Sequence, residues 1–244
     1  MKFRTDKDLE LLRYADNDML DVLVNYLTKD KDGSERLTES LTGNEEFKAA
    51  RGNYRQVWKL IGAELQHFGG DTFVNLFRGS GVVYREILTD VCKKLSVKTD
   101  FSADIVSIEQ ALLAKLFADS WEKMSEAERQ AIRKQLKIDG SLTSGAALTA
   151  IIGAIRLGGF MSYQVAMIVA NAVAKALLGR GLALAANAGL ARMIGIFAGP
   201  VGIAITALLT IPAISGPAFR VTLPAVVQIA AMRQQLLKKE EDIF

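Results

Sequence analysis

Apolar residues recur at intervals of three and four positions along most of the first 139 residues, and polar or glycine-containing breaks separate the runs. The clearest run covers residues 54–68, where the aromatic and aliphatic side chains fall on one face of a helix that stops at Gly69 and Gly70. A second run covers residues 84–95. Residues 5–28 predict two shorter helices.

Residues suited to capping helices stand at the start of several of these runs. Asp6 or Asp8 is placed to cap the first short helix, and Asn17 is placed to cap the second. Ser107 and Ser125 are each followed three residues later by Gln or Glu, the spacing of a capping box, which predicts two further helices. No stretch alternates with the period of two that is typical of a half-buried strand, so we expect an all-α fold.

The residues after 139 follow a different pattern, with long uncharged runs at 157–174 and 193–219. Runs of this kind approach or exceed the roughly 20 residues that span a bilayer as a helix. Prolines interrupt the second run and argue against one straight helix. We therefore expect an αα-hairpin that bends at Gly199 and Pro200.

Small residues recur every fourth position in this half, as at Ala166, Ala170 and Ala174. The spacing places a smooth stripe along each helix, a pattern typical of helix pairs in membranes. Arginines lie at the edges of the uncharged runs, where their long side chains can reach lipid head groups. The residues expected to contact a membrane or a partner are Gly181, Gly189, Arg192, Gly195, Gly199, Pro200, Ile205, Leu208 and Arg220.

Charge divides the chain at the same place. Residues 1–139 hold 22 Lys or Arg and 24 Asp or Glu, whereas residues 140–239 hold no acidic residue. An ionised carboxylate is costly in hydrocarbon, and the core helix of a soluble protein normally keeps a charged outer face. This half must therefore be covered by lipid, by a partner or another subunit, or by the protein's own interior. We take membrane contact as the main hypothesis.

Candidate chemistry is sparse, since the chain has one histidine, His67, and one cysteine, Cys92. A single cysteine cannot form an intrachain disulfide, and no Cys/His cluster has the spacing of a zinc site. His67 forms a candidate polar pocket with Glu64, Asp71 and Arg78, in which it would serve as an acid–base group or a ligand. The alternative is a histidine at a helix C-terminus that bonds to a last-turn carbonyl or to Asp71. We expect no enzymatic activity, no cofactor and no metal.

Further features of the sequence bear on the location of the protein and on nucleic-acid, phosphate and thiol sites. The start of the chain lacks the apolar run of a secretory signal peptide, which favours the cytoplasm. The basic excess forms no Lys/Arg stripe, which argues against nucleic-acid binding. The segment from Arg78 to Gly81 precedes a helix but lacks the lysine of a P-loop, so a turn between helices is the simpler interpretation. Cys92 falls on an apolar helix face and is interpreted as a structural thiol.

Three segments resemble a known protein family. They are residues 58–71 (WKLIGAELQHFGGD), residues 78–91 (RGSGVVYREILTDV) and residues 219–230 (FRVTLPAVVQIA), and the family is the YaaW family of bacterial proteins. The resemblance spans most of the chain and is weakest between residues 140 and 215. The central helices of this family are similar to the ubiquinol–cytochrome c chaperone domain, an assembly-factor fold. The resemblance implies a role in binding a partner protein and brings no established biochemical activity.

We expect three parts: a short helical hairpin at 1–34, a helical domain at 35–139 that resembles the ubiquinol–cytochrome c chaperone fold, and an acid-free apolar helical module at 140–244. The main hypothesis is a non-enzymatic protein whose apolar hairpins insert into or dock on the cytoplasmic face of the inner membrane, with anionic lipid head groups as partners, as a homo-oligomer or a conditional effector. The alternative is a soluble chaperone or assembly factor that binds a partner protein through its central helices.

Overall fold

The computed structural model describes residues 2–30, 33–36, 39–69, 81–182, 194–196, 199–204, 206–207 and 217–241. Within these ranges the chain is all-α, as the spacing of apolar residues predicts. The β-type contact found among them is one isolated antiparallel bridge between Lys29 and Glu35, which closes a turn without building a sheet.

The N-terminal part consists of short helices packed around a shared apolar core. In chain order they are the 3-10 helix η1 (Lys7–Arg13), α1 (Asn17–Thr28), α2 (Glu45–Ala49), the 3-10 helix η2 (Tyr54–Val57) and α3 (Trp58–Phe68). Asp6 caps η1, because its carboxylate accepts a hydrogen bond from the backbone N–H of Asp8 at 3.0 Å. The structure therefore selects Asp6 from the two predicted caps. α3 ends at Phe68, with the predicted stop Gly69 as its C-cap.

Six further helices are given bounds in the rest of the described residues. They are α5 (Tyr84–Lys94), α6 (Ile105–Glu122), α7 (Glu126–Gln135), α8 (Ser144–Leu157), α9 (Gly159–Leu178) and α11 (Pro217–Glu241). The capping box predicted at Ser125 is confirmed at the start of α7. The cap predicted at Ser107 is wrong: Asp104 caps α6, and its carboxylate accepts from the Ser107 N–H at 2.9 Å. An aspartate at the N-cap accepts a hydrogen bond from a first-turn N–H as well as a serine does.

Asn17 also has a different role from the predicted one. It is the first helical residue of α1 rather than its N-cap. Its side chain accepts from the Tyr54 N–H at 2.8 Å and donates to the Gly52 carbonyl at 2.7 Å. Asn17 thereby ties the start of α1 to η2 instead of capping its own helix.

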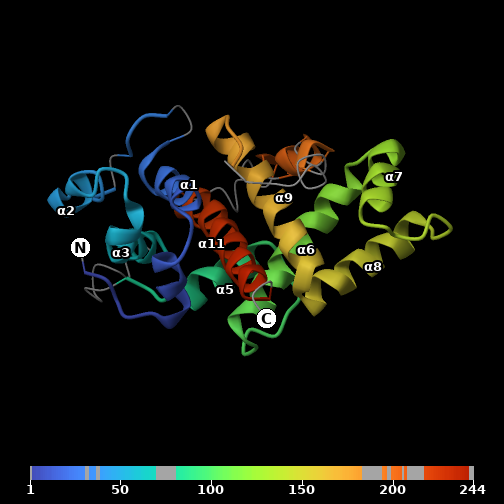
Figure 1. Ribbon diagram of the computed structural model, residues 1–244, viewed down its shortest axis with the longest axis horizontal. Helices are drawn as coiled ribbons and strands as arrows, with labels where there is room; N and C mark the ends of the chain where they lie inside the picture. Colours follow the sequence, from blue (N-terminus) through green and yellow to red (C-terminus); the bar gives the residue numbers. More distant parts are fainter. Residues whose placement is uncertain are drawn as a thin grey trace.

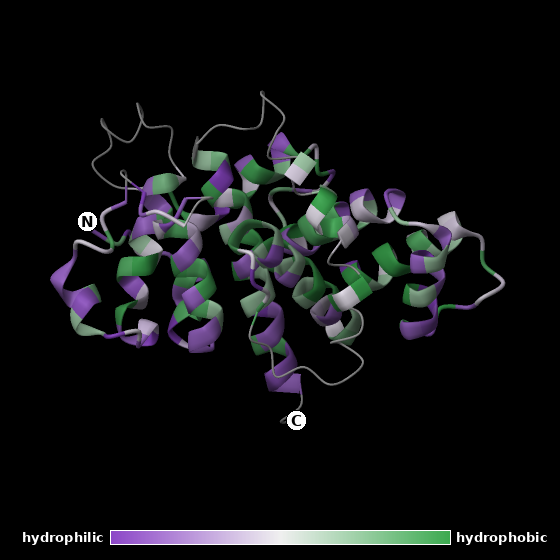
Figure 2. Cartoon of the chain, turned by 90° about the horizontal axis from the view of Figure 1, so that it is seen from above, coloured by the Kyte–Doolittle hydropathy of each residue, from purple (hydrophilic) through white to green (hydrophobic). Residues whose placement is uncertain are grey.

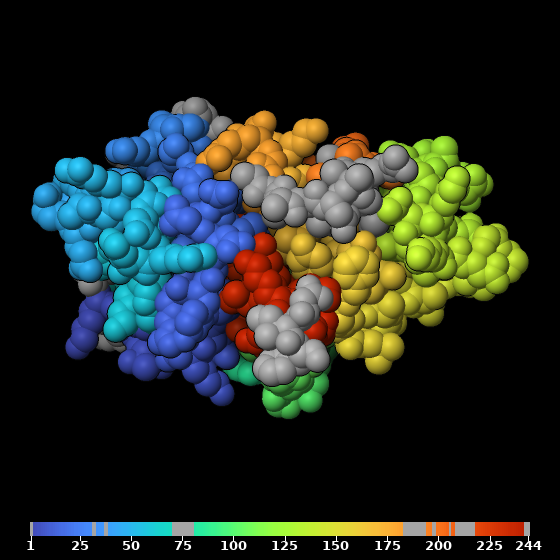
Figure 3. All heavy atoms as spheres, viewed as in Figure 1, coloured from blue at the N-terminus to red at the C-terminus, as the bar shows by residue number. Residues whose placement is uncertain are grey.

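α11 is the central helix of the fold. It packs against η1, α1, α3 and α5 on one side and against α6 and α9 on the other (Figure 1). Residues 221–232 of α11 are buried, and hydrophilic residues gather in its last turns near the C-terminus (Figure 2). The space-filling view shows α11 in red, flanked by the blue N-terminal helices and the yellow α8–α9 pair (Figure 3). The C-terminal helix therefore joins the two ends of the molecule.

This position of α11 bears on the expected division of the chain. A helix from the acid-free module covers the helices of the first 139 residues, so apolar contacts cross the expected boundary. The three parts at 1–34, 35–139 and 140–244 stay a prediction.

The uncharged run at 157–174 begins at the last residue of α8 and otherwise lies in α9 after the glycine joint. α8 ends at Leu157, and the chain turns into α9 through Gly158 and Gly159, whose φ angles are +85° and +67°. Residues other than glycine rarely adopt this left-handed backbone conformation, which explains the glycine pair at the joint. The chain therefore folds α8 and α9 against one another and against α6.

Candidate interaction sites

A charged pair lies in the interior, where η1, α5, α6 and α11 meet. Arg233 on α11 donates from Nε to Oε2 of Glu109 on α6 at 2.8 Å, and the Tyr84 hydroxyl on α5 donates to Oε1 of Glu109 at 2.7 Å. A second Arg233 nitrogen donates to the Asp8 carbonyl on η1 at 2.7 Å. Glu109 and Tyr84 are fully buried. Both carboxylate oxygens therefore have donors, the condition for keeping such a charge inside a protein.

The electrostatics of this pair indicate a structural role. Burial raises the pKa of Glu109, and the charge of Arg233 opposes that rise. Burial and the neighbouring Glu109 raise the pKa of Tyr84 well above its ordinary value. Tyr84 and Arg233 each donate to Glu109 within the core, and together with the bond to the Asp8 carbonyl these contacts join four helices. Sequence reasoning missed Glu109 and Arg233; the available signal was a single charge interrupting an apolar face on each of two helices.

The candidate polar pocket is only partly within the described residues. Asp71 and Arg78 lie outside them. Glu64 on α3 is buried and accepts from the Ser40 N–H at 3.3 Å and the Ser40 hydroxyl at 3.1 Å. Burial raises the pKa of Glu64, while the bonds from Ser40 lower it. His67 is exposed at the end of α3. Glu64 thus anchors the loop before α2, and the four-residue pocket stays a prediction.

In the described part of the chain, the Cys92 thiol is not in a reactive environment, and no cluster of metal-binding side chains is found. Cys92 on α5 is buried, and burial raises the pKa of its thiol to about 12. A thiol with this pKa stays protonated at neutral pH, which agrees with a structural thiol. Among the described residues, no three His, Cys, Asp or Glu side chains lie together in a way that would hold a metal ion.

One described helix, α9, is long and apolar enough to cross a membrane. However, 67% of its most apolar window is buried inside the protein. Ala166, Ala170 and Ala174, the predicted smooth stripe, are all buried among the helices that α9 contacts, α6, α8 and α11. Small residues at this spacing let neighbouring backbones approach closely in any apolar environment. Within this fold the stripe packs helices of the same chain together.

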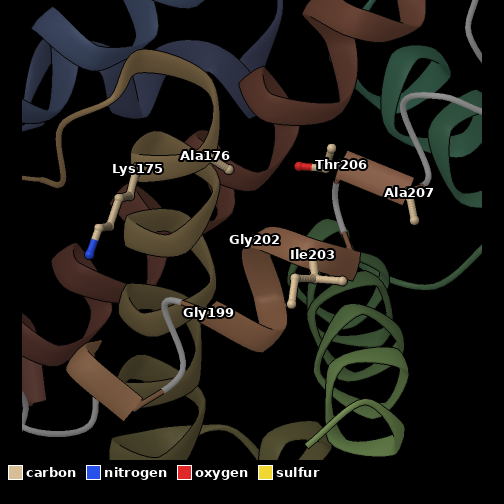
Figure 4. Close-up of a pocket in the computed structure, with 7 residues that line it drawn as sticks. All are labelled: Lys175, Ala176, Gly199, Gly202, Ile203, Thr206 and Ala207. Carbon is tan, nitrogen blue, oxygen red and sulfur yellow. The ribbon is translucent and has the colours of Figure 1, made fainter.

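An apolar hollow of about 580 Å³ opens at the C-terminal end of α9 (Figure 4). Its lining residues are Lys175, Ala176, Gly199, Gly202, Ile203, Thr206 and Ala207. Ala176 projects from α9 toward the segments that carry Gly202 and Thr206, whereas Lys175 extends to the other side of the helix. Ile203 is 60% exposed, an unusual environment for a large apolar side chain.

Two residues predicted to form a bend have a helical conformation. Gly199 and Pro200 lie in the described helical residues 199–204. Both residues are helical, but their neighbours at 197–198 lie outside the described residues, so the hairpin expected there stays a prediction. Gly199 also lines the hollow, so this predicted interface residue lies at a surface feature.

The remaining residues expected at a membrane or partner interface fall in different places. Gly181 lies against buried Asn171, where an added Cβ would come within 2.5 Å of the amide oxygen. Gly195 is exposed, and Arg220 is exposed in the first turn of α11. The residues that lie outside the described part are Gly189, Arg192, Ile205 and Leu208. The expected set of interface residues as a whole stays a prediction.

Comparison with known proteins places the chain in a family. Residues 53–227 match the model of the ubiquinol–cytochrome c chaperone, and residues 3–37 match a domain of unknown function (DUF3944). A UPF0174 protein of Helicobacter pylori (strain J99) is 40% identical over 99% of this chain and 96% of its own length. The UPF0174 protein YaaW of Escherichia coli (strain K12) is 34% identical over 97% of each chain. No solved structure was found to match this chain.

These matches confirm the resemblance carried by residues 58–71, 78–91 and 219–230. The chaperone match extends from just before η2 into α11 and so includes the hollow and the buried Glu109. The chain belongs to the UPF0174 family, with the YaaW proteins among its members, and it contains the ubiquinol–cytochrome c chaperone domain.

Proposed function

We propose that this protein is a non-enzymatic, chaperone-like protein that binds an apolar segment of a partner protein in the hollow at the end of α9. The hollow is the observation that carries the proposal, because it joins small residues and an exposed Ile203 in a part of the chain without acidic residues. It also lies within the residues that match the ubiquinol–cytochrome c chaperone.

The shape of the hollow suits an apolar guest. An added Cβ at Gly199 would meet nothing within 4 Å, so a partner side chain can approach the backbone there. Covering the exposed part of Ile203 contributes on the order of 1–2 kcal/mol, since full burial of such a side chain contributes about 1.5–3 kcal/mol.

Site-specific photocrosslinking in the native cell tests this proposal. A photoreactive amino acid replaces Ile203 in the full chain, and a matched control replaces Tyr14, which is 55% exposed on the N-terminal part. We expect discrete protein adducts from position 203 and a different, weaker pattern from position 14. Identical patterns at the two positions, or no protein adduct at 203, would contradict the proposal.

A second pair of variants separates the hollow from general surface effects. Gly199→Leu fills the hollow, whereas Gly153→Leu adds the same side chain to the exposed face of α8, where a Cβ also meets nothing within 4 Å. The first variant is expected to remove the adducts and the second to leave them. Loss in both variants would show that the hollow is not the binding surface.

Docking on the cytoplasmic face of a membrane is the second candidate, supported by the exposed Ile203 in an acid-free segment. In this alternative the hollow and its rim rest on anionic lipid, and a homo-oligomer presents several such rims. Flotation of the full chain with anionic liposomes tests it, with Ile203→Asp as the disrupting variant. Lipid adducts at position 203 together with flotation would favour this alternative over partner-protein binding.

A further inference from the structure

A second cavity lies at the opposite end of α9, where the α8–α9 joint meets the first turn of α6 and the last turns of α11. Its volume is about 600 Å³. The start of α9 and Lys175 are separated by about 24 Å at 1.5 Å per residue, so this cavity is distinct from the hollow in Figure 4.

A buried residue with an unused hydrogen-bond donor lines this cavity. Gln234 on α11 is 3% exposed, and its amide nitrogen has no hydrogen-bond partner among the described residues. The nearby Gln110 on α6, by contrast, donates to the Ser162 hydroxyl at 3.3 Å. Buried amide groups in native proteins are nearly always paired, so Gln234 calls for an acceptor that enters the cavity.

The backbone donors at the start of α9 line the same cavity. Gly158 occupies the N-cap position, and no described side chain caps the helix there. The first N–H groups of a 20-residue helix have no intrahelical acceptor, and they carry the positive end of the helix dipole. A negatively charged acceptor satisfies both needs. Two independent sets of donors, the Gln234 amide and the α9 backbone, therefore adjoin one space.

Apolar side chains stand beside these donors. Leu157 is 90% exposed and Leu237 is 37% exposed, and both line the cavity. Leu157 is the last residue of α8 and directly precedes the glycine joint. A ligand whose acceptor group reaches the donors can cover both leucines with an attached apolar chain, which favours its binding through burial of apolar surface.

The charges around the cavity favour a ligand with a single negative charge. Arg156 and Lys238 contribute two positive charges, whereas Glu240 and Glu241 contribute two negative ones. The Lys238 ammonium lies 3.9 Å from the Glu241 carboxylate, which leaves Arg156 as the cation on the α8 side. Since the lining has no net charge, it suits a single carboxylate better than a phosphate-rich ligand.

We propose that this cavity binds a carboxylate attached to an apolar chain. The carboxylate accepts from the N–H groups at the start of α9 and from the Gln234 amide, and the apolar chain covers Leu157 and Leu237. Polypeptide C-termini and free small carboxylic acids both present this chemistry. The site goes beyond the partner-binding hollow, and either site can be lost without the other.

Fluorescence polarisation on the full chain tests the site with a labelled pentapeptide, Gly-Ser-Ala-Ala-Leu, that ends in a free carboxylate. The same peptide with an amidated C-terminus is the matched probe. We expect the acid to bind about tenfold more tightly than the amide, because only the acid carries the charge that the α9 terminus favours. Equal binding of the two peptides would overturn the proposal.

Two variants connect binding to the cavity. Gln234→Leu replaces a buried unpaired amide with an apolar side chain of similar size, so the melting temperature is expected to stay the same or rise while the affinity falls about fivefold or more. Arg156→Ala is expected to weaken binding, whereas Arg220→Ala, an exposed arginine at the other end of α11, leaves binding unchanged. Equal effects of the two arginine variants would place the ligand elsewhere.

Competition with unlabelled hexanoate identifies the source of the carboxylate. If hexanoate displaces the labelled peptide at the same concentration as the unlabelled peptide does, and if Gln234→Leu weakens this displacement, the result supports the site and assigns it to free acids. Displacement by the peptide alone supports the site and assigns it to polypeptide C-termini. Binding of neither probe would overturn the proposal, and it would leave the crosslinking results at Ile203 unaffected.

Discussion

The Arg233 guanidinium meets the Glu109 carboxylate at 2.8 Å in the interior, although 124 residues separate the two positions in the chain. The contact fixes α11 against α6, and the bonds from Tyr84 and to Asp8 extend it to α5 and η1. An ion pair of this kind recovers in attraction and hydrogen bonds what it loses in hydration. Its value to the protein therefore depends on both partners being present.

Removing one partner of this pair should be strongly destabilising. We expect Arg233→Met to lower the free energy of unfolding by about 3–5 kcal/mol, because Glu109 is left as an uncompensated buried acid. The double variant Arg233→Met with Glu109→Gln should recover a large part of that loss, since no charge remains inside. Urea unfolding followed by circular dichroism measures both. Equal instability of the single and double variants would show that lost packing, not the unpaired charge, is the cause.

Glu64 should make stability depend on pH. Burial raises its pKa, so the folded protein holds this proton more tightly than the unfolded chain does. The stability that this proton provides is present at low pH and is lost as the pH rises through the raised pKa of Glu64. Glu64→Gln is neutral at every pH, so we expect it to be more stable than the natural chain at pH 8, with the difference shrinking toward pH 4.

Urea midpoints measured between pH 4 and pH 8 check this prediction. Glu46→Gln, at an exposed position of α2, is the matched control and should follow the natural chain throughout. Parallel curves for Glu64→Gln and the natural chain would mean that Ser40 stabilises the ionised carboxylate fully.

The helices of the first part were predictable because local spacing and capping carry their information. The run at 54–68 became η2 and α3, and Ser125 began α7 with its capping box. The environment of Ala166 was not predictable, because the same spacing suits lipid and protein interior alike. The deciding neighbour, α11, begins 51 positions later at Pro217 and depends on tertiary packing. Gln234 was missed for the same reason, since a lone glutamine near a helix end gives no sign of its burial.

Cys92 should resist thiol reagents in the folded protein. Burial raises its pKa to about 12, so very little reactive thiolate forms at pH 8, and access is blocked as well. We expect labelling by iodoacetamide to be at least about a hundredfold slower than in 6 M guanidinium chloride, where the unfolded chain exposes an ordinary thiol. Mass spectrometry of the intact chain over time measures the rate. Rapid labelling without denaturant would show that α5 opens readily.

Gly81 should tolerate no side chain. An added Cβ would lie 2.5 Å from the backbone carbonyl carbon of Gln66, and the Val82 N–H bonds to that same carbonyl at 3.1 Å. Because backbone atoms cannot move aside cheaply, we expect Gly81→Ala to lower the free energy of unfolding by about 1–3 kcal/mol. Gly153→Ala is the matched control in open space within α8, and it should raise stability by about 0.5–1 kcal/mol. Similar urea midpoints for the two variants would contradict the close approach at Gly81.

The packing of α11 leads us to expect that residues 1–139 do not fold fully on their own. Gln228 on α11 donates to the Met19 carbonyl on α1 at 2.9 Å, and α11 also covers α3 and α5. A fragment of residues 1–139 lacks this cover, so we expect it to be helical yet to bind the dye ANS strongly. A synthetic peptide of residues 217–241 should bind the fragment and reduce dye fluorescence, because it restores the missing apolar contacts.

A peptide carrying Val226→Asp is the control, since it places a charge at a fully buried position of α11. It should bind the fragment at least about tenfold more weakly than the natural peptide, which fluorescence titration measures. If the fragment alone unfolds cooperatively and binds little ANS, residues 1–139 form a self-contained unit and α11 only rests on its surface. If the natural peptide restores cooperative unfolding and the Val226→Asp peptide does not, the folding unit includes both ends of the chain. The central position of α11 leads us to expect the second outcome.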